Sequence, residues 1–453
     1  MTLTTKSRLN YFAICLATLS VVSSYGLGAL FHSYDELAKS WLGVFTIAQY
    51  FGLTIAMIIA WYAAPRSNQL SDYRFLIYFA VLAHLVLIPI ESYTSNDVSR
   101  YLFDGKLFVD GFDPYRTPHN APEVNEIRHL WQPPSEHLSY VTLYPPLAIL
   151  LFGLAANAGV EWAGLVWSTL VAFSAIGTLW ICTLILMHIR RLHYLPLVAL
   201  SPLLILETGI GGHIDSVLTL AVSVAVLMWL KQRYFLTGLF IGLGALIKFL
   251  PILLLLPLTF SSKKVPESVK MITGTLGLLF IAYSITVLIG LVPIGSIDVF
   301  FQKWRFGSPL FATLESITSV QAHMAIAAGI LIMLSGLIAV VAWRMRSVRN
   351  VAIVGLLMQL TMALPFLLGP VVFPWYLCVL VPLLILRPNA TLLLWMTLLP
   401  FTYEVLGLFV AEGLWQPAIW PLLLIAYGLM VGLAIDYKGI FLKRKTVMNL
   451  WLN

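Results

Sequence analysis

Long apolar segments recur along the whole chain, and their length constrains its fold more than any other feature. A helix needs about 20 apolar residues to cross a lipid bilayer. Of the 453 residues, 60% are hydrophobic and only 10% are charged, whereas about a quarter of a soluble domain is charged. This composition excludes a soluble enzyme, a secreted disulfide-linked scaffold and a disordered chain. We predict an all-α, polytopic membrane protein with spans near residues 10–31, 41–64, 74–90, 163–188, 194–209, 214–230, 270–292, 322–343, 350–368, 371–386, 390–410 and 416–435.

Two further apolar segments are ambiguous, and the distribution of charge decides between their alternatives. Residues 143–159 fit either a span or a helix lying along the surface, and residues 234–260 fit either one long span or two short ones. Lys and Arg gather in the cytoplasmic loops of membrane proteins. This rule is satisfied best if 143–159 stays at the outer surface and 234–260 crosses twice, with a break at Lys248 and Pro251.

The resulting topology is strongly asymmetric in charge. Nineteen of the 27 basic residues then face the cytoplasm, against about three of the 20 acidic ones. We therefore expect about 14 crossings (12–14), with both termini cytoplasmic. The excess of basic residues that gives the net charge of +7 is thus placed in cytoplasmic loops, so it does not indicate a nucleic-acid partner.

One outer segment, residues 91–141, differs in composition from everything around it. It holds eight of the 20 acidic residues, three of the nine His and five of the 24 Pro, and a long loop of this kind is usually functional. Asp97, Tyr101 and Asp104 follow helical spacing and share one face, and Arg100 and Asp104 have the spacing of an ion pair. We expect a helix on the outer membrane surface. From spacing alone, its acids are either a site for chemistry or a solvated face whose charges pair with one another.

Several short motifs in this loop and beyond it carry a family resemblance. In chain order they are Ser95-Asn96-Asp97-Val98-x-Arg100-Tyr101-x-x-Asp104-Gly105, Gly111-Phe112-Asp113-Pro114-Tyr115, Tyr144-Pro145-Pro146-Leu147, Gly212-His213-x-Asp215, the stretch from Leu236 to Pro251 that contains Lys248, Trp304-x-Phe306-x-Ser308-Pro309-Leu310, and Pro374-Trp375-Tyr376. The first resembles the first outer loop of GT-C glycosyltransferases. The set is most similar to bacterial polyprenyl-phosphate-mannose-dependent mannosyltransferases, and more distantly to the first mannosyltransferase of GPI-anchor assembly.

The resemblance implies an activity and a place for it. It implies an integral-membrane glycosyltransferase that moves a hexose, mannose above all, from a polyprenyl-phosphate donor to a lipid- or glycan-linked acceptor. The chain would lie in a bacterial inner membrane with its active site on the extracytoplasmic face. Residues 1–90 would form N-terminal spans, 91–160 the catalytic loop with juxtamembrane helices, and 161–453 the remaining bundle.

The same resemblance implies that Asp97 is the general base of an inverting single displacement. The phosphate leaving group needs stabilisation of its charge more than a proton, whereas the acceptor hydroxyl needs a base. Asp104 is a second catalytic candidate, which would orient the acceptor or fix Arg100.

Three basic residues are candidates for binding the donor phosphate. Lys248 lies in an apolar run, where a charge costs about 2.5–3.5 kcal/mol on insertion scales. Arg305 and Arg100 are the other two, since a guanidinium can hold phosphate oxygens through two parallel hydrogen bonds. Lys248 has an alternative interpretation, in which its ammonium simply reaches the membrane interface.

A further set of residues is expected to line the sugar and acceptor pocket. For His213, Asp215 and Glu207, a metal site and a helix cap are alternatives, but we expect no metal and no cofactor. For Trp375 and Tyr376 the alternative is a membrane-interface aromatic belt. The full set is Tyr101, Tyr115, Arg116, Tyr144, Glu207, His213, Asp215, Trp375 and Tyr376.

Two other classes of function stay open at this point. A lipid-linked-sugar transporter or flippase would also combine many helices, broken segments and a buried lysine. A polysaccharide polymerase or ligase would share chemistry on the outer face. Neither explains the acid-rich early loop as well as the transferase does.

Overall fold

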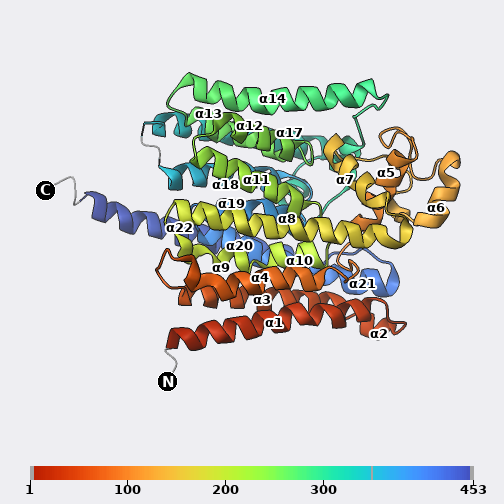
Figure 1. Ribbon diagram of the computed structural model, residues 1–453, viewed down its shortest axis with the longest axis horizontal. Coiled ribbons are helices and arrows are strands. Elements are labelled where there is room, and N and C mark those ends of the chain that lie inside the picture. Colours follow the sequence, from red (N-terminus) through yellow and green to blue (C-terminus); the bar gives the residue numbers. More distant parts are fainter. Residues whose placement is uncertain (1–4, 348–349, 449–453) are drawn as a thin grey trace.

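The chain folds into a bundle of helices of very different lengths. The computed structural model describes residues 5–347 and 350–448, and among these residues ten helical segments are long and apolar enough to cross a membrane. The described backbone outside helices is loops and turns, with one isolated β-bridge between Phe306 and Val371. Figure 1 shows the long helices running side by side along the length of the molecule.

The ten segments of membrane-spanning length are built from the main helices given below. Short helices precede or interrupt some of them: α2 (Glu36–Lys39), α9 (Pro196–Ala199), and the 3-10 helices η1 (Leu70–Tyr73), η4 (Leu192–Tyr194) and η7 (Leu399–Glu404). The main helices are α1 (Thr5–Phe31), α3 (Leu42–Ala63), α4 (Arg74–Leu87), α8 (Val160–His188), α10 (Pro202–Gly209), α14 (Val265–Leu288), α17 (Val320–Met345), α18 (Val351–Leu368), α20 (Ala390–Leu398), α21 (Val405–Glu412) and α22 (Trp420–Met448).

Ten of the twelve spans predicted from the sequence are confirmed as helical segments of membrane-spanning length. The other two, at 214–230 and 371–386, are shorter: α11 (Asp215–Leu230), and η6 (Pro374–Leu380) followed by α19 (Val381–Leu384). The expected count of about 14 needs these two and both halves of 234–260 as crossings, and it stays a prediction.

The segment 234–260 is broken in the place where the sequence predicted a break. α12 (Tyr234–Ala245) ends before Lys248, and the chain resumes as η5 (Leu250–Leu254) and α13 (Leu255–Phe260). α12 packs closely on α14 because glycine lines the contact. A Cβ atom on Gly238 would lie 2.0 Å from the Met271 carbonyl oxygen, which is the close backbone approach that small residues allow between membrane helices.

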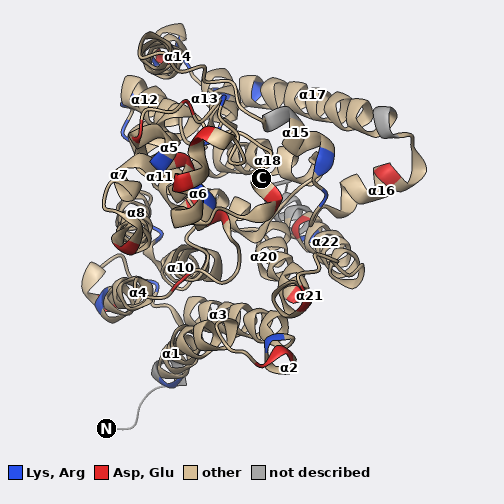
Figure 2. Ribbon diagram, turned by 90° about the vertical axis from the view of Figure 1, so that its right-hand side faces the viewer, with Lys and Arg blue, Asp and Glu red and all other residues tan. Residues whose placement is uncertain are grey.

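The acid-rich loop folds into short helices at one end of the bundle. They are α5 (Asp97–Val109), η2 (Pro122–Val124), α6 (Asn125–Trp131), η3 (Ser135–His137) and α7 (Pro146–Ala156). In Figure 1 this end is opposite the start of α1 and the end of α22. Figure 2, which faces it, shows charged positions gathered around α5 and α6. The helix predicted near Asp97 is present. α7, at 11 residues and about 16 Å, is too short to span a bilayer.

A second loop, between α14 and α17, completes this end of the molecule. It contains α15 (Ile297–Lys303) and α16 (Pro309–Ile317). Phe306 donates its backbone N–H to the Pro370 oxygen at 3.1 Å and accepts from the Val372 N–H at 2.8 Å. These bonds hold the loop beside η6, so two of the motifs found in the sequence lie side by side.

Candidate active site

A cavity of about 1500 Å³ lies at the end of the bundle that carries α5. Its polar wall comes from residues 91–100, η3 and the break around Lys248, and its apolar walls come from η5, α17, α18 and α21. Seven of the fourteen predicted site residues line it: Asp97, Arg100, Tyr144, Asp215, Lys248, Trp375 and Tyr376.

Asp97 begins α5 and faces the cavity. The Tyr101 hydroxyl, one turn later, donates to Asp97 Oδ2 at 3.1 Å, and the Tyr144 hydroxyl donates to that of Tyr101 at 3.3 Å. Burial, and then the neighbouring Asp97 charge, raise the pKa of Tyr101 well above its usual value, and the same two causes raise the pKa of Tyr144. Both phenols therefore stay protonated, and Tyr101, which itself accepts from Tyr144, orients Asp97 Oδ2. No described residue donates to Oδ1.

Arg100 lies one turn from Asp97 and is only 6% exposed. Its Nε has no hydrogen-bond partner among the described residues, although the side chain lines the cavity. A buried charge without a partner is costly. The site therefore holds a cation that an anionic ligand would satisfy.

Arg100 and Asp104, which have the spacing of an ion pair, do not form one. Asp104 instead pairs with His119, whose Nε2 lies 2.7 Å from Asp104 Oδ1, and both side chains are buried. The His119 ring also packs edge-on against Phe103, with the ring centres 4.6 Å apart. Asp104 thus faces the loop that follows α5 and lies behind the cavity wall.

Lys248 supplies a second cation on the cavity wall. Its Nζ lies 2.6 Å from Asp215 Oδ2 and 4.6 Å from the centre of the Tyr376 ring. The interaction with an aromatic face adds to the ion pair. The Lys248 ammonium is thus held at the cavity wall by a carboxylate and an aromatic ring.

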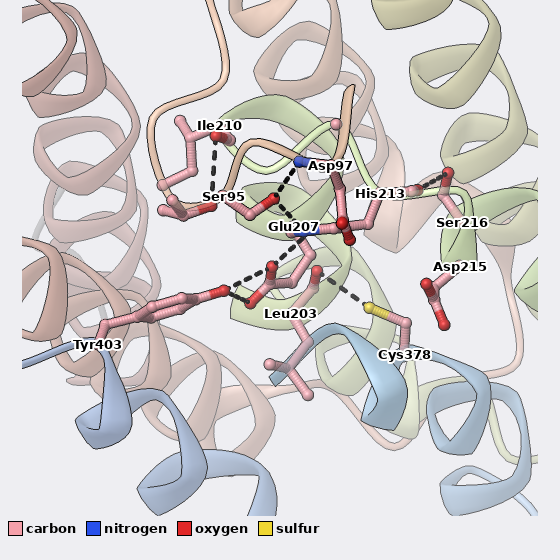
Figure 3. A network of polar contacts seen from close by, with 12 residues as sticks. Ser95, Asp97, Leu203, Glu207, Ile210, His213, Asp215, Ser216, Cys378 and Tyr403 are labelled. Carbon is pink, nitrogen blue, oxygen red and sulfur yellow. Dashed lines mark hydrogen bonds and ion pairs between the residues drawn. The ribbon is translucent and has the colours of Figure 1, made fainter. Parts of the chain in front are cut away.

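Glu207 and His213 lie behind the wall and do not line the cavity. Glu207 Oε1 accepts hydrogen bonds from Tyr50 and Tyr403, both at 2.8 Å. His213 Nδ1 lies 3.1 Å from Glu207 Oε2 at an angle outside hydrogen-bond geometry, and its ring stacks on Trp375 at 3.8 Å. Figure 3 shows Glu207 between Tyr403 and His213. Among the described residues no group of three or more His, Cys, Asp or Glu side chains could hold a metal ion.

The remaining predicted residues lie away from the cavity wall. Tyr101 and Asp104 are buried behind it, as described above. Arg116 is exposed, whereas Tyr115 is buried, and burial raises the pKa of the Tyr115 phenol above its usual value. Arg305 pairs with Glu315, Nε to Oε1 at 2.8 Å, and donates to two backbone carbonyls.

Some cavity residues were not predicted from the sequence. His137, Glu136 and Trp304 all line the cavity. The His137 and Trp304 ring centres are 5.4 Å apart, and the Asn96 amide donates to Glu136. Burial and then Arg100 lower the pKa of His137 to about 4. For His137 and Glu136 the only signal was the richness of the loop in His and acids, whereas Trp304 begins one of the motifs quoted above.

The fold and the cavity together define an integral membrane protein with a candidate active site at one end of its bundle. Residues 12–261, more than half of the 453, match the family model described as "Alpha-(1->6)-mannopyranosyltransferase, N-terminal domain". The chain belongs to this mannosyltransferase family, which confirms the family resemblance found in its motifs. The match includes Asp97, Asp215 and Lys248. No curated protein and no solved structure matches the chain.

Proposed function

We propose that this protein transfers mannose from a polyprenyl-phosphate donor to a lipid- or glycan-linked acceptor at the extracytoplasmic face of a bacterial inner membrane. The observation that carries the proposal is one cavity whose wall presents the Asp97 carboxylate together with the cations of Arg100 and Lys248. A carboxylate and two cations in one pocket are what the transfer of a sugar from a phosphate requires.

Asp97 acts as the general base. Its Oδ2 is occupied by the Tyr101 hydroxyl, which leaves Oδ1 for the hydroxyl of the acceptor. As Oδ1 takes the proton, the acceptor oxygen bonds to the anomeric carbon, and the bond from that carbon to the phosphate oxygen breaks. A positioned base is worth about 10²–10⁴ in rate. The configuration inverts, so an α-linked product requires a β-linked donor.

Arg100 and Lys248 stabilise the departing phosphate. The unpartnered Nε–H of Arg100 donates a charge-assisted hydrogen bond to a phosphate oxygen, and such a bond is about twice as strong as a neutral one. Lys248 is held at the wall by Asp215. Because these cations stand in place before the reaction, they stabilise the developing negative charge with little reorganisation.

The apolar part of the cavity suits the isoprenoid chain of the donor. It continues from Lys248 along Phe249 and Leu253 to Ala327 and Leu331 of α17. Apolar walls next to a phosphate-binding cation match a lipid whose head is charged and whose tail is a hydrocarbon. In this proposal Trp375 and Tyr376 contact the sugar, which lies between the phosphate-binding cations and the Asp97 carboxylate.

Purified protein supplied with polyprenyl-phosphate-mannose tests the proposal. We expect mannose in the acceptor and one free polyprenyl phosphate for each mannose transferred, and no transfer from a nucleotide-linked mannose. Movement of intact donor across the membrane would instead indicate a flippase. Transfer that requires a diphosphate donor would indicate the polymerase or ligase chemistry.

A further inference from the structure

We infer that Glu207 and His213 are positioning residues, which fix the first turn of α5 through Ser95 and thereby aim the Asp97 carboxylate. The inference rests on the proposed function, in which Asp97 is the base. It differs from the expectation that these two residues line the pocket, because both lie behind the cavity wall.

The chain of contacts starts in the interior of the bundle. Glu207 on α10 is 1% exposed, and its carboxylate accepts hydrogen bonds from Tyr50 of α3 and Tyr403 of η7. The rings of these two tyrosines are 5.4 Å apart. A buried carboxylate with two hydroxyl donors is held in one orientation. Three separate parts of the bundle therefore fix its position.

His213 connects Glu207 to the loop that precedes α5. One ring nitrogen lies 3.1 Å from Glu207 Oε2, and the other lies 2.9 Å from Ser95 Oγ. The turn before it is tight, because Gly212 has a φ of +62°, and a Cβ atom there would lie 2.6 Å from Ser92 Oγ. Stacking on Trp375, with the two rings 11° from parallel, prevents the imidazole from tilting.

Ser95 connects the histidine to the base. Its Oγ accepts the backbone N–H of Asp97 at 3.4 Å, and the same oxygen is the partner of His213 Nε2. One assignment of protons is consistent with these positions: the Ser95 hydroxyl donates to Nε2, and Ser95 Oγ accepts from the Asp97 N–H. Nδ1–H then lies on the side of Glu207 Oε2, at ion-pair distance but outside hydrogen-bond geometry. Figure 3 shows this path from Tyr403 through Glu207 to Ser95 and Asp97.

Backbone bonds make the same connection beside the side chains. The Tyr93 N–H donates to the Ile210 carbonyl at 3.0 Å, and the Thr94 hydroxyl donates to it at 3.4 Å. The loop that leads into α5 thus rests on the turn between Glu207 and His213. The same turn continues to Asp215, which holds Lys248. One segment therefore sets the place of both the base and a phosphate-binding cation.

Ser95 offers the sharpest test, because it lies in the loop and its substitution leaves the bundle interior intact. We expect Ser95→Ala to lower kcat by about 10- to 100-fold, as a small misplacement of a catalytic group does, with the donor KM within about twofold. Ser95→Thr keeps the hydroxyl and should keep most of the activity. Hydrogen exchange of the peptide 93–101 should be faster in Ser95→Ala than in the unaltered protein.

A double-variant cycle tests whether Glu207 acts through Ser95. Glu207→Gln should lower kcat when it is the only substitution, but it should have no further effect in a Ser95→Ala background. The effects of substitutions within one network are not additive. Multiplying effects, or a raised donor KM with kcat unchanged, would overturn the inference. If Asp97→Asn abolishes turnover while Ser95→Ala has normal kcat, only this inference fails. If Asp97→Asn is fully active, the proposed function itself fails.

Discussion

The ammonium of Lys248 lies 2.6 Å from Asp215 Oδ2. Lys248 itself stands in the break between α12 and η5, within a run of otherwise apolar residues. Asp215 is 1% exposed, so each charge depends on the other. This pair accounts for the presence of a lysine in an apolar run. It also places a cation at the cavity wall, where the donor phosphate of the proposed reaction would lie.

Separate measurements of stability and activity can distinguish the two roles of this pair. Lys248→Gln should lower kcat/KM for the donor by about 10²-fold, as the loss of one charge-stabilising group does. It should also lower the melting temperature, because it leaves Asp215 buried without a counter-charge. The double variant Lys248→Gln with Asp215→Asn should recover the melting temperature but not the activity.

A surface ion pair provides the control for that experiment. Lys106 and Asp110 pair at 2.7 Å one turn apart on α5, and both side chains are partly exposed. Such pairs contribute about 0–1 kcal/mol, so Lys106→Gln should change neither quantity appreciably. Recovery of activity in the double variant would contradict the phosphate-binding role of Lys248.

The contact between α5 and α7 depends on a glycine. A Cβ atom on Gly105 would lie 2.3 Å from the backbone carbonyl carbon of Phe152, so Gly105→Ala has to push the two helices apart. We expect a loss of about 1–3 kcal/mol of stability and reduced turnover, since Tyr101 stacks on Phe152 at 4.6 Å. Gly277→Ala is the matched control because nothing lies near its Cβ position. Equal melting temperatures for the two variants would contradict this packing.

The environment of His137 predicts how stability depends on pH. Its pKa is lowered from 6.5 to about 4, so the unfolded chain takes up a proton near pH 6.5 and the folded one only near pH 4. The contribution of His137 to stability is therefore complete above pH 6.5 and is lost as the pH falls from 6.5 to 4.

Replacing His137 removes this dependence. Between pH 7 and pH 5, the melting temperature of His137→Gln should fall less than that of the unaltered protein. His129 is exposed on α6, and His129→Gln serves as the control, with the same pH dependence as the unaltered protein. A steeper loss in His137→Gln would mean that the imidazole is charged in the folded state.

The proposed orientation in the membrane can be tested by labelling. Glu126 is exposed on α6, and Lys263 is exposed in the turn before α14. In intact cells a membrane-impermeant maleimide should modify Glu126→Cys but not Lys263→Cys. After the cells are opened, both should react. The reverse pattern would place the cavity on the cytoplasmic side.

The sequence was sufficient to predict the features that depend on segment length and on local spacing. Spans such as 163–188 were found because lipid requires long apolar helices. The break at Lys248 was found because a charge and Pro251 interrupt one of them. The helix that begins at Asp97 was found from its 3.6-residue repeat.

The contacts between distant segments were not predictable in this way. The spacing allowed Asp104 to pair with Arg100 in its own helix, but Asp104 pairs instead with His119 in the following loop. Glu207 is held by Tyr50 and Tyr403, which are 157 and 196 residues away in the sequence. Nothing in the spacing of these residues distinguishes a pocket wall from a support behind it, because both are polar residues in apolar surroundings.

The most direct test of the central claim is turnover by Asp97→Asn in purified protein supplied with polyprenyl-phosphate-mannose and acceptor. The amide keeps the size of the side chain and can still accept the Tyr101 hydrogen bond, but it cannot take a proton. We predict that transfer falls by at least about 10²-fold while donor binding and melting temperature stay unchanged. Transfer at the rate of the unaltered protein would contradict the assignment of Asp97 as the base.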